Sequence, residues 1–104
     1  MRVLLGEPAG WYLLEDSGEL YLDVNCNQSA VGFDITVRLD PAERAAFSRA
    51  GRPFAAELAE QIAYSPRTYW PRNITGPLDS QITEAILAYR RDTGEYPAGG
   101  GAPL

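Results

Sequence analysis

Hydrophobic and polar residues alternate through most of the first forty positions of the chain. Apolar side chains occupy every second position over residues 20–26 and again over residues 31–39, which is the period of a half-buried β-strand. Residues 11–15 read as a further strand, and residues 3–5 can add a short edge strand. The pattern predicts an antiparallel sheet of three to four N-terminal strands, arranged as a meander.

The two longer strands are expected to form a hairpin through a polar connection at residues 27–30. A two-residue turn at positions 28–29, or a four-residue loop in the same register, sets Leu22 opposite Ile35 on the apolar face. On the other face the same register sets Asp23 directly opposite Asp34. Like charges in that position repel one another unless a cation lies between them.

Several interpretations of Asp23 and Asp34 remain open. Arg2 or Arg38 can bridge the two carboxylates, or the register can differ from the expected one. Alternatively, a lysine or arginine of a partner protein completes the site, or the pair divides an acid and a base role between its members. A metal site is disfavoured, because two aspartates with Asn25 offer few oxygen ligands.

The first hairpin has an ambiguous register. The sequence Asp-Ser-Gly-Glu at residues 16–19 is typical of a turn. A two-residue turn places Trp11 and Leu13 on the core face with Tyr12 and Leu14 outside, whereas a three-residue loop with a bulge exchanges the two pairs. Either register leaves an aromatic residue and a leucine on the outer face. That face is a binding patch unless the last helix covers it.

Beyond residue 39 the apolar spacing becomes that of helices. Asp40, Pro41 and Glu43 are typical of a capping box, and we expect this first helix to end near Gly51. Pro53 can open a second helix that stops before residue 66. Its apolar stripe consists of Phe54, Leu58 and Ile62, with Ala55 and Ala59 beside them.

Residues 65–77 are predicted to form an irregular loop that carries Arg67, Tyr69, Trp70 and Arg72. A last helix is expected from about residue 78 to 92, capped by Asp79 or Ser80 and ended by Gly94. It should bury Ile82, Ile86 and Tyr89. The chain is therefore predicted to be a single α+β domain over residues 1–95, with two to three helices packed on the sheet. Residues 96–104, rich in glycine and proline, are predicted to be a disordered tail.

The composition excludes several kinds of chemistry. The chain of 104 residues has no histidine, its nine basic residues are all arginine, and it has a single cysteine. Nucleophile pairs that need histidine, a structural zinc site and an internal disulfide are therefore not expected. Cys26 falls in register with the apolar residues of its strand and is expected to be a small core residue. We predict no enzymatic activity, no cofactor and no metal.

The net charge of -5 is concentrated in the first forty residues, where seven acids meet two arginines. From residue 41 onward seven acids balance seven arginines. An acidic sheet argues against a nucleic-acid partner, since such binding needs a basic surface. No segment has the length of a membrane span, and the apolar run at the N-terminus ends after three residues, so we expect a cytoplasmic protein with no membrane partner.

Parts of the chain resemble a group of known proteins. The sequences LYLDVNC at residues 20–26, VGFDI at residues 31–35, LDPAE at residues 39–43 and AYRRDTGEYP at residues 88–97 are similar to those of small bacterial immunity proteins, the partners of secreted polymorphic toxins. The resemblance covers about a third of the chain, and its motifs are structural. It implies a cytoplasmic, non-enzymatic inhibitor that occludes the active site of a cognate toxin, often a nuclease or another enzyme with a basic cleft.

The sequence accordingly favours a stoichiometric protein inhibitor that binds a toxin through an acidic, aromatic-bearing sheet face. Aromatic anchors supply contact area in such a surface, and acids speed association with a basic partner. The expected contacts are Tyr12, Glu15, Asp16, Glu19, Tyr21, Asp23 and Asp34. The alternative is a structural or regulatory module that forms a homodimer through an exposed edge strand or through Trp11 and Tyr12.

Overall fold

The computed structural model describes residues 1–8, 10–26 and 32–94. Four strands form one antiparallel sheet in the order β1-β2-β3-β4. They are β1 (Arg2–Glu7), β2 (Trp11–Asp16), β3 (Glu19–Cys26) and β4 (Phe33–Arg38). The helical segments α1 (Pro41–Ala50), α2 (Arg52–Tyr64), α3 (Pro66–Tyr69), η1 (Trp70–Arg72) and α4 (Thr75–Thr93) follow. The predicted α+β class and the meander are confirmed.

The hairpin of β2 and β3 has the shorter of the two turns considered from the sequence. Ser17 and Gly18 connect the strands with φ values of 53° and 84°, and the ladder begins with Asp16 opposite Glu19. Two successive residues with positive φ are typical of a type I′ turn, whose twist matches that of paired strands. Trp11 and Leu13 therefore face the side of the sheet predicted to hold the core, and Tyr12 and Leu14 face the other side.

The hairpin of β3 and β4 differs from the predicted register by two residues. Leu22 pairs with Val37, Asp23 with Thr36, and Asn25 with Asp34. The expectation that Asp23 stands directly opposite Asp34 is therefore wrong. A shift of two residues leaves every side chain on its predicted face, because strand side chains alternate with a period of two. The two aspartates remain diagonal neighbours on one face. Most of the connection, residues 27–31, lies outside the described residues.

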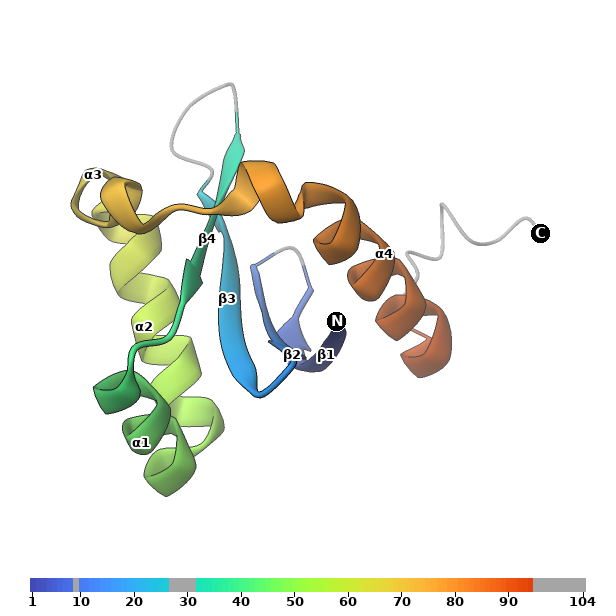
Figure 1. Ribbon diagram of the computed structural model, residues 1–104, viewed down its shortest axis with the longest axis horizontal. Helices are drawn as coiled ribbons and strands as arrows, with labels where there is room; N and C mark the ends of the chain where they lie inside the picture. The colour runs from blue at the N-terminus through green and yellow to red at the C-terminus, as the bar shows by residue number, and fades with distance from the viewer. Residues whose placement is uncertain (9, 27–31, 95–104) are drawn as a thin grey trace.

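One face of the sheet forms the larger core, against α2. The apolar stripe predicted for the second helix packs against this face of the sheet. Figure 1 shows α1 and α2 together on this side. The buried residues of this cluster are Trp11, Leu13, Leu22, Val24, Cys26, Ile35, Val37, Leu39, Ala55, Leu58, Ala59 and Ile62. Cys26 is thus a buried core residue, as predicted.

The opposite face is covered by α4, which lies on the other side of the sheet in Figure 1. Tyr12 and Leu14 are buried against Ile82 and Ala85 of this helix. The prediction of an open outer face is therefore wrong, and the alternative in which the last helix covers it holds. Further apolar side chains pack around this cluster half-buried, namely Met1, Val3, Tyr21, Leu78, Ile86 and Tyr89.

The helix boundaries agree with the sequence except around α4. Asp40 and Glu43 form the predicted capping box of α1, and α2 ends at Tyr64, just before Pro66. The region predicted as an irregular loop instead contains α3, η1 and the first turn of α4, which begins at Thr75. Pro77 does not prevent this early start, because the amides of a helix's first turn have no partner within the helix. Neither Asp79 nor Ser80 is the cap.

The β4 edge of the sheet is closed by the chain that leads from η1 into α4. The Thr36 amide donates to Asn73 Oδ1 at 2.9 Å, and the Ile74 amide donates to the Thr36 carbonyl at 2.9 Å. Arg72 Nη2 donates to the Arg38 carbonyl at 2.8 Å. These bonds satisfy groups that an exposed edge strand would offer to another chain. In Figure 1 this segment runs across β4 into α4.

Two further predictions concern the ends of the chain and the membrane. The tail at residues 96–104 lies outside the described residues. Within residues 1–8, 10–26 and 32–94, no helix combines the length and the apolar character that a membrane crossing requires.

Candidate functional site

Three of the predicted contact residues are acids that already have partners in the molecule. Arg2 Nε lies 2.9 Å from Glu15 Oε1, and the N-terminal amine lies 3.6 Å from Asp16 Oδ1. Arg44 Nη1 lies 3.3 Å from Glu19 Oε1. All three carboxylates are at the turn end of the β2–β3 hairpin, and their charge is balanced locally. They form no uncompensated acidic surface.

The predicted aromatic contacts lie under α4. Tyr12 is buried, and its ring meets that of Tyr89 edge to face with centroids 5.9 Å apart. Tyr21 is half-buried against the same cluster. Trp11 is buried on the opposite face, where Arg52 lies over its ring at 5.3 Å. Trp11 and Tyr12 therefore do not form the shared patch that the homodimer hypothesis invoked.

Asp23 is a carboxyl group inside the molecule. It is 4% exposed, and Thr36 Oγ1 donates a hydrogen bond of 2.7 Å to its Oδ1. Burial, the charge of Asp34 and a hydrogen bond with Asp34 raise the pKa of Asp23 to about 7, against the lowering effect of Thr36. Burial and the charge of Asp79 likewise raise the pKa of Asp34. The pair therefore retains a proton to a higher pH than an ordinary aspartate does.

A small cavity adjoins this carboxyl pair, between the sheet and α4. Its volume is about 190 Å³, and it is lined by Gly10, Tyr12, Asp23, Asn25, Asp34, Ile86 and Arg90. A protonated carboxyl can donate a hydrogen bond or a proton, and its ionised neighbour can accept one. The pair can therefore exchange a proton with a group in the cavity. Among the described residues, no group of three or more cysteine, aspartate or glutamate side chains could hold a metal ion.

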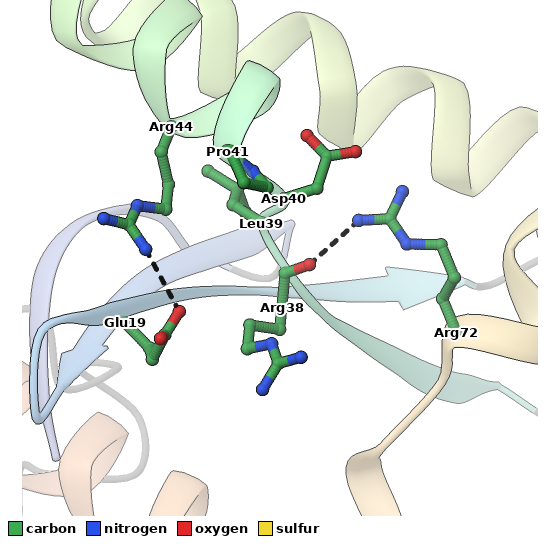
Figure 2. A pocket seen from close by; sticks show the side chains of 7 residues that line it. All are labelled: Glu19, Arg38, Leu39, Asp40, Pro41, Arg44 and Arg72. Atoms are coloured by element: carbon green, nitrogen blue, oxygen red, sulfur yellow. Dashed lines mark hydrogen bonds and ion pairs between the residues drawn. The ribbon is translucent and has the colours of Figure 1, made fainter.

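A second concave surface lies where β4 meets α1 (Figure 2). It has a volume of about 380 Å³ and is lined by Glu19, Arg38, Leu39, Asp40, Pro41, Arg44 and Arg72. Figure 2 shows Arg44 directed at Glu19 and Arg72 directed at the backbone carbonyl of Arg38. Arg72 also makes a double hydrogen bond with Glu43, which raises the pKa of Arg72. Two of the three arginines are thus engaged by the protein itself, so the hollow is a weak candidate for binding an anion.

The end of the sheet where β4 begins carries a different combination of residues. Phe33 is 39% exposed and Trp70 is 57% exposed, and their rings meet edge to face with centroids 6.0 Å apart. Asp34 follows Phe33 in β4, and the charge of Asp79 at the start of α4 acts on Asp34. We call these four residues, Phe33, Asp34, Trp70 and Asp79, the aromatic–acidic end.

Of the predicted contacts, only Asp34 belongs to this end. Phe33 was missed because it continues the apolar alternation of Ile35 and Val37, which indicates a core position. Its place at the first residue of β4 leaves it partly outside that core. Trp70 was noted in the 65–77 segment, but nothing in the local sequence brings it beside Phe33. The sequence predicts Asp79 as a helix cap, whereas α4 begins four residues earlier.

Comparison with known proteins identifies no relative of this chain. No family model, no curated protein and no solved structure matches the chain.

Proposed function

We propose that this protein is a non-enzymatic, stoichiometric inhibitor that binds a protein partner through the aromatic–acidic end and occludes a basic site on that partner. The observation that carries the proposal is the exposed edge-to-face pair of Phe33 and Trp70. Asp34 follows Phe33 in β4 and points to the opposite side of the sheet, where the charge of Asp79 acts on it. Exposed tryptophan is the residue type most enriched among binding hot spots, and neighbouring acids favour a basic partner. The resemblance to immunity proteins supports a toxin, such as a nuclease, as that partner.

The charge distribution supports this end over the hairpin end. Glu15 and Glu19 lie within 3.3 Å of arginine nitrogens, so a partner's cations would have to displace existing ion pairs there. At the aromatic–acidic end, the charge of Asp79 instead raises the pKa of Asp34, and the charges of both raise the pKa of Asp23. A cation of the partner placed at this end would relieve that repulsion.

The test is co-expression with the products of the two genes adjacent to the one that encodes this chain. The proposal predicts that one product arrests growth alone, that this chain restores growth, and that the two proteins purify as a 1:1 complex. If neither neighbour is toxic and neither binds at low salt, the inhibitor hypothesis is wrong.

Variants then locate the surface. Replacing Phe33 and Trp70 together by alanine should weaken the complex by about 2–4 kcal/mol, the range of interface hot spots. The matched aromatic control is Tyr64→Ala on α2, where the side chain is 85% exposed; it should leave affinity unchanged. Equal losses from the double variant and the control would place the interface elsewhere.

The acids have a matched control of their own. Replacing Asp34 and Asp79 by asparagine removes two carboxyl groups, as does replacing Glu57 and Glu60 of α2 by glutamine. The first change should slow association at low salt by about 10-fold or more, whereas the second changes only the net charge and should have a smaller effect. Stopped-flow association at low and high salt distinguishes the two.

A further inference from the structure

A chain of hydrogen bonds links the buried carboxyl pair to the first residue of α4. Thr36 Oγ1 donates to Asp23 Oδ1 at 2.7 Å, and Thr75 Oγ1 lies 2.8 Å from Thr36 Oγ1 as a donor to it. Asn73 Oδ1 accepts from the amides of Thr36 and Thr75 at 2.9 and 3.1 Å. The start of α4 is thus held to β4 by a polar network that ends on Asp23.

Apolar burial holds α4 less firmly than it holds α2. Of the 19 residues of α4, Ile82 and Ala85 are buried, whereas α2 buries four of its 13 residues. Its N-cap, Ile74, provides no side-chain hydrogen bond. Because hydrophobic stabilisation scales with buried apolar area, the polar network contributes a larger share of the docking of α4 than it could at α2.

The two carboxyls of the pair come from β3 and β4. The groups that face them are Tyr12 of β2 and Asp79 and Arg90 of α4. The burial of Cys26 and the charges of both aspartates raise the pKa of its thiol, which stays protonated. Arg90 is the one cation among the described residues that line the cavity. Full ionisation of the pair would therefore place two carboxylates in a cavity with one guanidinium, with the charge of Asp79 acting on both carboxylates.

We propose that a single proton shared by Asp23 and Asp34 controls the docking of α4, so that the helix is held on the sheet while the pair keeps the proton and is released when both carboxyls are ionised. The inference does not rest on the proposed function. It concerns the isolated protein, and it makes the cover of one sheet face responsive to pH.

The pKa of Asp23 sets the direction and the pH window. That pKa is about 7 in the folded protein, against 3.8 for an ordinary aspartate. The docked state thus binds a proton that the open state loses, so docking is strongest at low pH and weakens as pH rises toward 7. Ordinary carboxyl groups have ionised by about pH 5. Between about pH 5 and pH 8, a change in the docking of α4 therefore reports the titration of this pair.

Amide hydrogen exchange on the whole protein tests the proposal, with α2 measured alongside α4. After correction for intrinsic exchange, the opening constant of α4 should rise by close to 10-fold per pH unit between about pH 5 and 7 and level off by about pH 8. Complete unfolding also frees the pair, so α4 must in addition exchange faster than α2 at neutral pH. Equal protection of the two helices, or α4 exchange that is independent of pH, overturns the proposal.

Asp23→Asn supplies the decisive variant, because asparagine keeps an acceptor for Thr36 and cannot ionise. The opening constant of α4 in this variant should be constant from about pH 5 to 8, while Glu84→Gln, a single-charge control on the exposed side of α4, should behave as wild type. Should Asp23→Asn fail to fold, Asp34→Asn serves instead, since removing the neighbour lowers the pKa of Asp23. The rise should then level off at a lower pH. A wild-type profile in whichever variant folds contradicts the proposal.

Discussion

The two faces of the sheet are made by alternate residues of the same four strands, yet they differ in kind. The buried part of the face under α2 is apolar, with Leu22, Val24, Ile35 and Val37 in one cluster. The face under α4 contains Tyr12 and Leu14 but also a buried carboxyl, Asp23, and a buried hydroxyl. The apolar face can supply stability at every pH, whereas the mixed face depends on where a proton lies.

The face under α2 therefore stabilises the fold, whereas the face under α4 can respond to a change in pH. A buried polar network stabilises only while all its members are satisfied. An apolar core has no such condition, and removing side chains from it has the largest effect.

The largest expected effect is therefore on the α2 face. Ile62 is fully buried in the larger cluster, and Ile62→Ala should lower the free energy of unfolding by about 3–4 kcal/mol through lost burial and a cavity. Ile82→Ala makes the same chemical change under α4 and should cost about 2 kcal/mol, because the less enclosed site can collapse. Urea denaturation of both variants compares the faces. A larger loss for Ile82→Ala would reverse the ranking.

The next effect is the pH dependence of stability. Because the pKa of Asp23 is raised to about 7 in the folded state, the unfolded chain binds fewer protons between about pH 5 and 7. The free energy of unfolding should thus fall by about 2–3 kcal/mol from pH 5 to pH 8, at 1.4 kcal/mol per pH unit for one proton. Urea denaturation at both pH values measures it, and Asp23→Asn should abolish the fall. Stability that rises over this interval in the wild type would contradict the assignment.

The faces themselves could be predicted from the sequence, but their covering could not. The alternation of apolar and polar residues assigns Leu22, Asp23 and Ile35 to the correct faces. The error in register does not change this assignment, because a shift of two residues leaves each side chain on the same face. The error came from the length of the β3–β4 connection, which local residue types do not fix. Whether α4 lies over Asp23 depends on the path of the chain past β4. That path is a tertiary property, and the hydrophobic pattern of the sequence does not predict it.

The third effect concerns a close contact on the α4 side. Gly6 pairs with Tyr12 in the sheet, and a Cβ added at Gly6 would overlap the Tyr12 ring. Gly6→Ala should therefore lower the free energy of unfolding by about 1–2 kcal/mol, as substitutions that overpack a site do. Gly76→Ala in the first turn of α4 meets no atom within 4 Å and should be neutral or slightly stabilising. Thermal denaturation of both variants tests the contact, and similar melting temperatures would exclude it.

The smallest effect is expected at the exposed ion pairs of the hairpin. Arg2 and Glu15 lie at the surface with a 2.9 Å contact, and Arg2→Met should change stability by less than about 0.5 kcal/mol. Urea denaturation at low and at high salt checks this value. A loss above 1 kcal/mol would mean that the acids of this region contribute to the fold, which would weaken the contrast with the buried carboxyl.

The candidate binding surface was predictable only in part. The aromatics that the sequence placed on an exposed sheet face, Tyr12 and Tyr21, are buried and half-buried under α4. Of the predicted contacts, Asp34 belongs to the surface now proposed. The partners of Glu15 and Glu19 lie 13 and 25 positions away in sequence, so local charge counting could not show that they are neutralised. The contact of Phe33 with Trp70 spans a larger separation in sequence and depends on η1 lying against β4.

The contrast between the faces depends most directly on the ionisation of Asp23. Carboxyl carbon chemical shifts of Asp23 and Asp34, followed by NMR from about pH 3 to pH 9, measure it without any variant. We expect Asp23 to titrate near pH 7, with a coupled inflection in the shift of Asp34. Titration of both carboxyls below about pH 5 would show that the face under α4 holds no shared proton, and it would contradict the account.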